Sequence, residues 1–77
     1  MKLTIDLNLY ASLRHFAPPN ASSYPVEAGT TIEAMIEALN IPKNQILLIF
    51  SNGVKCGLQT LLKDGDRIGI FPPVGGG

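Results

Sequence analysis

The residues with the clearest chemical potential are the last seven, Phe71-Pro72-Pro73-Val74-Gly75-Gly76-Gly77. Glycine lacks a Cβ, so three consecutive glycines make a thin peptide that a narrow enzyme cleft can admit. Each proline fixes φ and lacks an N–H, so a sheet ladder should stop at Pro72 and Pro73 and the tail should leave stiff and extended. The pattern predicts a domain over residues 1–71 and a flexible tail over residues 72–77 that presents the Gly77 carboxylate. A frayed end or a cloning remnant could also be glycine-rich, so the residues before the tail must show whether the tail has a function.

Two other reactive side chains have simpler explanations than catalysis. His15 is the only histidine and falls in an expected surface turn. Cys56 is the only cysteine, so it has no partner for an internal disulfide or a metal site, and it is expected to pack as a small apolar residue. A persulfide on Cys56 is the minor alternative. The sequence predicts no metal site and no bound cofactor.

The charged residues also favour structural roles. Asp64 and Asp66 flank a glycine, which is typical of a turn. Arg14 and Arg67 are expected to be solvated charges, with partner contacts as the alternative. We find no paired carboxylates at useful spacing, no Ser/His/Asp set and no phosphate-binding loop.

Composition limits the class of protein. A chain of 77 residues makes one small domain, and an apolar fraction of 45% is typical of a globular chain. No apolar run approaches the roughly 20 residues of a membrane helix, and the start of the chain lacks the apolar core of a signal peptide. Six basic and six acidic residues are scattered, which argues against a nucleic-acid binder or a polybasic membrane anchor. We therefore expect a cytoplasmic protein.

Five segments have strand patterns. The first alternates apolar and polar residues, the third is a continuous apolar run typical of a central strand with Leu48 buried at its middle, and the last points Ile68 and Ile70 inward. The predicted strands cover residues 2–9, 22–26, 46–50, 54–56 and 67–71. Asn52-Gly53 predicts a hairpin between the third and fourth, because a type I′ turn needs positive φ at both positions.

One helix is predicted between the second and third strands, after a short helical turn over residues 11–16. Thr30 as N-cap and Glu33 three residues later fit a capping box. Asn40 can take the left-handed position at the end of this helix, and Pro42 prevents its continuation. A single apolar stripe consists of Ile32, Met35, Ile36 and Leu39. The element order therefore predicts one sheet with one helix across one face.

With this element order and ending, the chain resembles a known family, the MoaD/ThiS sulfur carriers, which are ubiquitin-like proteins with the β-grasp fold. The resemblance rests on the element order, on Asn52-Gly53, on the segment from Leu62 to Ile68 and on the ending from Ile70 to Gly77. The two prolines, with Ala11 and Arg14, are more similar to the small subunit of molybdopterin synthase than to the thiamine carrier ThiS. The resemblance implies an α+β fold, a mixed sheet of four to five strands with one helix across one face and a flexible glycine tail.

The resemblance also implies a chemistry and its partners. An adenylyltransferase of the ubiquitin-activating type (MoeB/ThiF-like) would use ATP to convert the Gly77 carboxylate to an acyl-adenylate. A persulfide from a sulfurtransferase would then displace AMP and leave a thiocarboxylate. The large subunit of molybdopterin synthase (MoaE-like) would use this sulfur to make the molybdenum or tungsten cofactor. Gly75 and Gly76 would give access, Pro72 and Pro73 would project the tail, and the chain would be a carrier rather than an enzyme.

An aromatic pair is predicted at the root of the tail. Tyr10 and Phe71 both fall on the outward phase of their strands. The first and last strands of β-grasp folds are parallel neighbours, so the two rings should lie at the same end of one face. We expect them to bind a partner together with Val74; alternatively, they merely cover the sheet.

Three other functions stay open at this point. The chain could carry sulfur for thiamine or for another sulfur-dependent product. It could be a ubiquitin-like modifier whose Gly77 forms isopeptide bonds with lysines. It could also be a non-covalent β-grasp interaction module with an idle tail.

Overall fold

The computed structural model describes residues 1–73 and shows a five-stranded sheet in the order β2-β1-β5-β3-β4. The strands are β1 (Lys2–Leu9), β2 (Tyr24–Glu27), β3 (Leu48–Ser51), β4 (Val54–Cys56) and β5 (Arg67–Phe71). One α-helix, α1 (Ile32–Ala38), follows β2, and three short 3₁₀ helices occupy the connections: η1 (Ala11–Phe16), η2 (Ala21–Ser23) and η3 (Lys43–Gln45). The predicted α+β fold with a mixed sheet is confirmed.

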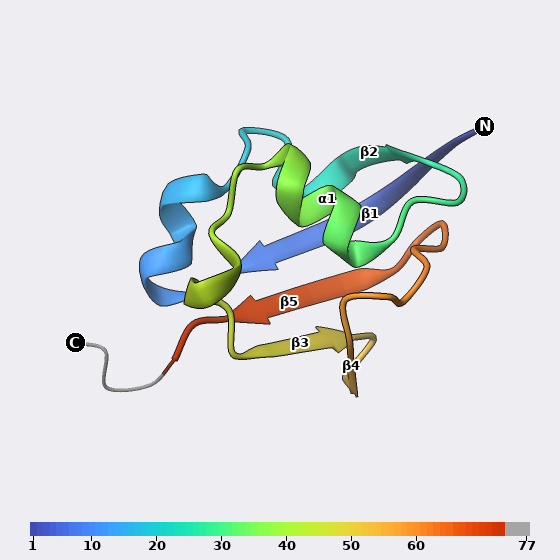
Figure 1. Ribbon diagram of the computed structural model, residues 1–77. Helices are drawn as coiled ribbons and strands as arrows, with labels where there is room; N and C mark the ends of the chain where they lie inside the picture. Colours follow the sequence, from blue (N-terminus) through green and yellow to red (C-terminus); the bar gives the residue numbers. More distant parts are fainter. Residues whose placement is uncertain (74–77) are drawn as a thin grey trace.

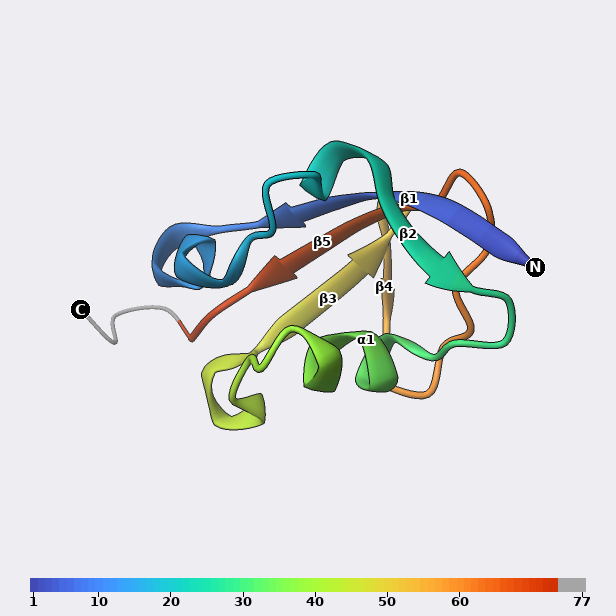
Figure 2. The same cartoon turned by 90° about the horizontal axis from the view of Figure 1, so that it is seen from above.

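The first and last strands form the centre of the sheet. β1 and β5 run parallel in the register Asp6 with Arg67 through Leu9 with Ile70 (Figure 1). All the other pairs, β1 with β2, β3 with β5 and β3 with β4, are antiparallel. The α1 helix lies across one face of this sheet (Figure 2). Within residues 1–73 no helix is long and apolar enough to cross a membrane.

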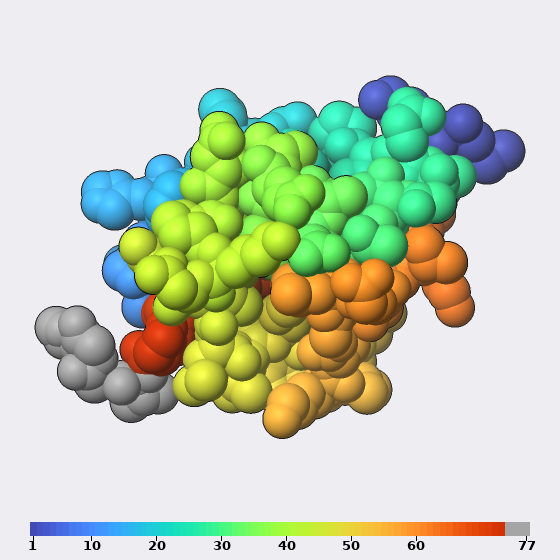
Figure 3. Space-filling view, viewed as in Figure 1, coloured from blue at the N-terminus to red at the C-terminus, as the bar shows by residue number. Residues whose placement is uncertain are grey.

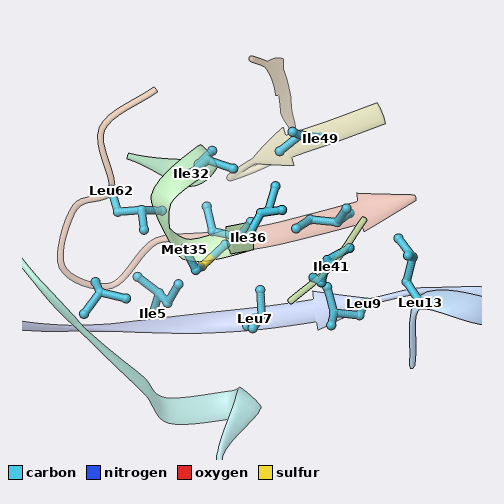
Figure 4. Packing of buried hydrophobic residues seen from close by; sticks show 13 residues of the cluster. Ile5, Leu7, Leu9, Leu13, Ile32, Met35, Ile36, Ile41, Ile49 and Leu62 are labelled. Carbon is cyan, nitrogen blue, oxygen red and sulfur yellow. The ribbon is translucent and has the colours of Figure 1, made fainter. Parts of the chain in front are cut away.

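The core lies between α1 and the central strands (Figure 4). Alternation along β1 and β5 sends every second side chain to this face, and the predicted stripe of α1 meets them. Leu13 of η1 is completely buried as well, which the sequence did not indicate. The buried apolar residues are Ile5, Leu7, Leu9, Leu13, Val26, Ile32, Met35, Ile36, Ile41, Ile49, Leu62, Ile68 and Ile70.

The α1 helix begins one residue later than predicted. Its N-cap is Thr31, whose Oγ1 accepts a hydrogen bond from Ala34 N at 3.1 Å, so the prediction of Thr30 as N-cap was wrong. Glu33 consequently sits too early to close a capping box and instead contacts side chains of later segments. The helix ends as predicted, with Asn40 at φ 62° and Ile41 N donating to Ile36 O at 3.1 Å.

For the third strand, both the predicted first residue and the predicted buried residue were wrong. β3 begins at Leu48 rather than at residue 46, and it lies next to the short edge strand β4, so β5 is the central strand. Leu48 is only half-buried, whereas Ile49 is 5% exposed and belongs to the core. The continuous apolar run concealed this alternation, because both faces of β3 carry apolar residues.

The second strand was also shifted. It covers Tyr24–Glu27 instead of residues 22–26, since residues up to Ser23 form η2. Val26 is buried and Tyr24 packs against the core, so both side chains lie on the core face of β2. Pro25 is tolerated because β2 is an edge strand of the sheet.

The two predicted turns are joined to each other by side chains. Asn52 and Gly53 have φ values of 55° and 83°, as a type I′ turn requires. Asn52 Nδ2 donates to Asp66 Oδ1 at 2.9 Å, and Asn52 Oδ1 accepts from Arg67 N at 2.9 Å. Asp66 is 7% exposed and also accepts from Lys63 N at 2.9 Å, while Asp64 Oδ1 accepts from Thr4 N at 2.9 Å. The turn roles predicted for both aspartates are confirmed.

Candidate functional site

The root of the glycine-rich tail lies at the end of the central strand. Phe71 is the last residue of β5, where it pairs with Leu48, and its carbonyl oxygen accepts a hydrogen bond from Leu47 N at 2.8 Å. Pro72 follows directly, and because proline has no N–H it cannot donate to a continued ladder. The candidate residues Val74, Gly75, Gly76 and Gly77 lie outside the described residues. The tail therefore departs from the middle of the sheet, on a strand that is paired on both sides.

An aromatic cluster stands beside this root. The rings of Tyr10 and Phe71 stack with their centroids 4.3 Å apart and their planes 4° from parallel. Phe50 of β3 meets Phe71 edge to face, with a centroid distance of 5.7 Å. Tyr10 is 42% exposed, and Phe50 and Phe71 are half-buried. These three residues form a surface that we call the aromatic face.

The backbone explains why the rings meet. Tyr10 comes directly after β1 and its N–H donates to Ile70 O at 3.2 Å, which continues the parallel pairing of β1 with β5. Gly69 of β5 lies beneath these two rings and pairs with Asn8 of β1 and Phe50 of β3. A Cβ at Gly69 would lie 3.4 Å from Tyr10 Cε2 and 3.7 Å from Phe71 Cε1. The missing side chain thus leaves the space that the Tyr10 and Phe71 rings cover.

The predicted proximity of Tyr10 and Phe71 on the open face is therefore present in the structure, whereas their role in binding a partner stays a prediction. Phe50 was not predicted. Its signal was the phase of β3, which was lost in the uninterrupted apolar run from Ile46 to Phe50. Knowledge that Phe50 pairs with Gly69 would have placed the Phe50 ring on the same face as Tyr10 and Phe71. That register depends on contacts between segments distant in the sequence.

The other candidate side chains, from Arg14, His15, Cys56 and Arg67, are not part of the aromatic face. Arg67 is exposed and its Nε lies 3.7 Å from Asp6 Oδ2, so it is a solvated, loosely paired charge. Arg14 and His15 are exposed on η1. Cys56 is half-buried in the edge strand β4 and packs against the core. Among residues 1–73 no group of three or more His, Cys, Asp or Glu side chains is placed to hold a metal ion.

The perturbed titratable groups belong to ion pairs rather than to the aromatic face. The pKa of Glu33 is lowered mainly by a hydrogen bond from Lys43, and the pKa of Glu27 is lowered mainly by one from Lys2. Hydrogen bonds to Glu33 and Glu37 raise the pKa of Lys43 to about 12. These pairs connect secondary-structure elements and leave the aromatic face uncharged.

The mixed sheet in the order β2-β1-β5-β3-β4 with one helix across one face is the fold of small ubiquitin-like proteins. The family model described as Mut7-C ubiquitin matches residues 2–75, and the chain belongs to that family. A search of curated proteins found no match.

Several solved structures resemble the chain over nearly its whole length. The HVO 2177 protein of Haloferax volcanii matches with a TM-score of 0.76 and 22% identity, over 99% of this chain and 88% of that protein. A putative molybdopterin converting factor, subunit 1, from Pyrococcus furiosus matches with a TM-score of 0.62 and 23% identity, over 96% and 99%. The small archaeal modifier protein 1 (SAMP1) of Methanosarcina acetivorans matches with a TM-score of 0.66 and 27% identity, over 100% and 99%. The expected resemblance to MoaD-type ubiquitin-like proteins is confirmed.

Proposed function

We propose that this chain is a cytoplasmic sulfur carrier of the kind that serves as small subunit of molybdopterin synthase. In this proposal an activating adenylyltransferase uses ATP to adenylate the Gly77 carboxylate, and a sulfurtransferase supplies the sulfur that makes it a thiocarboxylate. Gly75 and Gly76 pass through the enzyme clefts, Pro72 and Pro73 hold the tail away from the sheet, and a MoaE-like large subunit receives the sulfur. The chain supplies the carried group and the binding surface, and its partners supply the catalytic groups.

The observation that carries this proposal is the position of the tail's root. Pro72 follows the last residue of the central strand, and that residue, Phe71, is part of the aromatic face. An enzyme that binds the aromatic face would therefore meet the start of the tail at the same place. Exposed aromatic clusters are frequent anchors of protein interfaces. The likeness to the putative molybdopterin converting factor subunit is consistent with this use of the fold.

A second candidate is a ubiquitin-like modifier whose Gly77 becomes linked to lysines of other proteins. The likeness to a protein named small archaeal modifier protein 1 favours it. Both candidates need the same activated carboxylate and differ in the final acceptor, which is sulfur in one and an amine in the other.

Intact-mass analysis of the protein from its native cells distinguishes these functions. We expect a species in which sulfur replaces one oxygen at Gly77, and this replacement should disappear when the adenylyltransferase is absent. Conjugates of higher mass would instead indicate a modifier. An unchanged mass under all conditions would contradict both and leave a non-covalent interaction module.

The tail can be tested directly with the activating enzyme. Deleting Gly77, or adding one residue after it, should abolish ATP–pyrophosphate exchange because the reacting carboxylate is displaced or blocked. The melting temperature should not change, since the buried core residues found within residues 1–73 lie before Phe71. Normal exchange by the deletion variant would rule out activation at Gly77.

The aromatic face has its own test. Tyr10→Ala should weaken binding to the large subunit more than about tenfold, the effect expected of a central aromatic anchor. Loss of its stacking contact should lower the free energy of unfolding by only about 1 kcal/mol. Tyr24→Ala on the edge strand β2 is the matched control, because Tyr24 packs beside the core and pairs with Ile5, away from the three rings of the aromatic face. Titration calorimetry with each variant would show equal affinities if the aromatic face only covered the sheet.

A further inference from the structure

The β4 strand forms one edge of the sheet, next to β3, whose Phe50 belongs to the aromatic face. It pairs with β3 on one side, and no segment of residues 1–73 pairs with it on the other. An unpaired strand edge presents backbone N–H and C=O groups to any extended peptide that approaches it. In Figure 3 the yellow surface of β3 and the orange surface that follows β4 lie below the green surface of α1.

The register identifies which residue of β4 offers its backbone. Asn52 and Gly53 form a two-residue turn, so the flanking pair Ser51 and Val54 is hydrogen-bonded and the next pair, Phe50 with Lys55, is not. The N–H and C=O of Lys55 must then point away from β3. Lys55 therefore presents both a donor and an acceptor at the free edge.

A cavity of about 210 Å³ lies beside this edge. Ile46, Leu47 and Ile49 line it from the β3 side, and Cys56 and Leu58 line it from the β4 side. Leu47 is 56% exposed, and Val54 at the start of β4 is 67% exposed. Apolar surface this open is available to an apolar side chain of another molecule.

The charges around the cavity specify what kind of peptide fits. Lys43 lines the cavity, but its Nζ lies 2.7 Å from Glu33 Oε2 and 2.9 Å from Glu37 Oε2, so its charge is already compensated. Lys55 is exposed and makes no ion pair with any other residue that the structure describes. The uncompensated charge at this edge is therefore positive and belongs to Lys55.

We propose that β4 and its cavity bind an extended segment of another protein in which one acidic residue stands between two apolar residues. The segment would add to the sheet as a further strand, with its backbone paired to Lys55. Because side chains alternate between the faces of a strand, an acidic residue opposite Lys55 would share its face, and an apolar neighbour would enter the cavity. The proposed pairing uses the backbone of β4 and requires no activation of Gly77.

A second copy of this chain is a poorer occupant. Centred pairing of two β4 strands would bring Lys55 opposite the Lys55 of the other copy. Like charges directly opposite one another destabilise a strand pair, and an edge lysine is a common protection against self-association.

The test uses a blocked peptide with the order serine–isoleucine–glutamate–valine–serine, and a second peptide with lysine in place of glutamate. In titrations followed by ¹⁵N–¹H spectra, the glutamate peptide should shift the amide signals of Lys55, Cys56 and Gly57 and leave Tyr10 and Phe71 unchanged. It should bind about fivefold more tightly than the lysine peptide, as an attractive cross-strand pair replaces a repulsive one.

The control variants reverse or preserve this preference. Lys55→Glu should favour the lysine peptide, whereas Lys63→Glu, the same charge change at another exposed lysine, should leave the preference unchanged. Equal binding of both peptides, shifts confined to the aromatic face, or dimerisation of the protein through β4 would each overturn the proposal.

Discussion

At the scale of single residues, Leu48 and Ile49 show how strongly one position in a strand decides the role of a side chain. They are adjacent in β3 and both are apolar, yet Ile49 reaches the core and Leu48 pairs with Phe71 and stays half-buried. Their side chains point to opposite faces because a strand alternates with period two.

This difference predicts unequal costs for the same substitution. Ile49→Ala should lower the free energy of unfolding by about 2–5 kcal/mol, because a cavity would form in a domain with little core to spare. Leu48→Ala should cost about 1 kcal/mol, since only part of its side chain leaves water. Urea denaturation of the two variants measures both values. Equal losses would mean that the register of β3 with β5 is wrong.

At the scale of elements, the β3–β4 hairpin is attached to the start of β5 by one side chain. Asn52 occupies a positive φ and uses both its amide nitrogen and its oxygen to hold Asp66 and Arg67. The turn thus fixes its own conformation and the position of the central strand.

Replacing Asn52 separates these contributions. Asn52→Ala removes both hydrogen bonds and leaves the buried Asp66 carboxylate with one partner fewer, which should cost about 1–3 kcal/mol in addition to the strain at positive φ. Asn52→Gly keeps the turn conformation and loses only the hydrogen bonds, so it should be less destabilised than Asn52→Ala. Chemical denaturation of both variants would contradict this account if Asn52→Gly were the less stable.

The α1 helix is joined to the segments around it by an ion cluster. Lys43 of η3 contacts Glu33 and Glu37 of α1, and Gln59 Nε2 donates to Glu33 Oε1 at 3.1 Å. The cluster is exposed, so its contribution should be modest and should decrease with added salt.

The directions of these pKa shifts predict how the contribution depends on pH. Glu33 has its pKa lowered from 4.5 by Lys43, so the stabilisation is present above pH 4.5 and is lost as the pH falls through the lowered value. Lys43 has its pKa raised from 10.5 to about 12, so the stabilisation is complete below pH 10.5 and is lost as the pH rises through about 12. The difference in melting temperature between the wild type and Lys43→Met should therefore be constant between these limits and decrease outside them. A difference that does not vary with pH would show that Lys43 acts only by packing.

The elements that could be predicted from the sequence are those with local signals. The alternation of β1, the turn at Asn52-Gly53 and the left-handed Asn40 are each encoded within a few residues. The N-cap was displaced because Thr30 and Thr31 are chemically equivalent, and only the start of the helical hydrogen bonds distinguishes them. The burial of Leu13 and the inclusion of Phe50 in the aromatic face depend on contacts between distant segments, and periodicity does not report such contacts.

At the scale of the whole molecule, the two ends of the described chain are its most central parts. β1 and β5 pair in parallel, and Thr4 N donates to Asp64 Oδ1 across 60 residues. Within the described residues, β2 pairs only with β1, and the β3–β4 hairpin joins the sheet only through β5. The sheet is therefore continuous only when β5 is in place.

Truncation should therefore have an all-or-none effect that depends on its position. A chain ending at Asp66 lacks β5 and should show no cooperative thermal transition. A chain ending at Pro73 keeps the thirteen buried apolar residues that the structure describes and should melt like the full chain. Circular dichroism at increasing temperature tests both, and cooperative unfolding of the shorter chain would contradict a central role for β5.

This topology has a consequence for how the molecule is made. A ribosome produces β1 before β5, so a nascent chain cannot close this sheet until β5 has been synthesised. A product of premature termination would leave Ile5, Leu7 and Leu9 without their neighbours and would be a substrate for proteases. The population that escapes degradation would be enriched in chains translated at least as far as Phe71, the residue from which the tail begins.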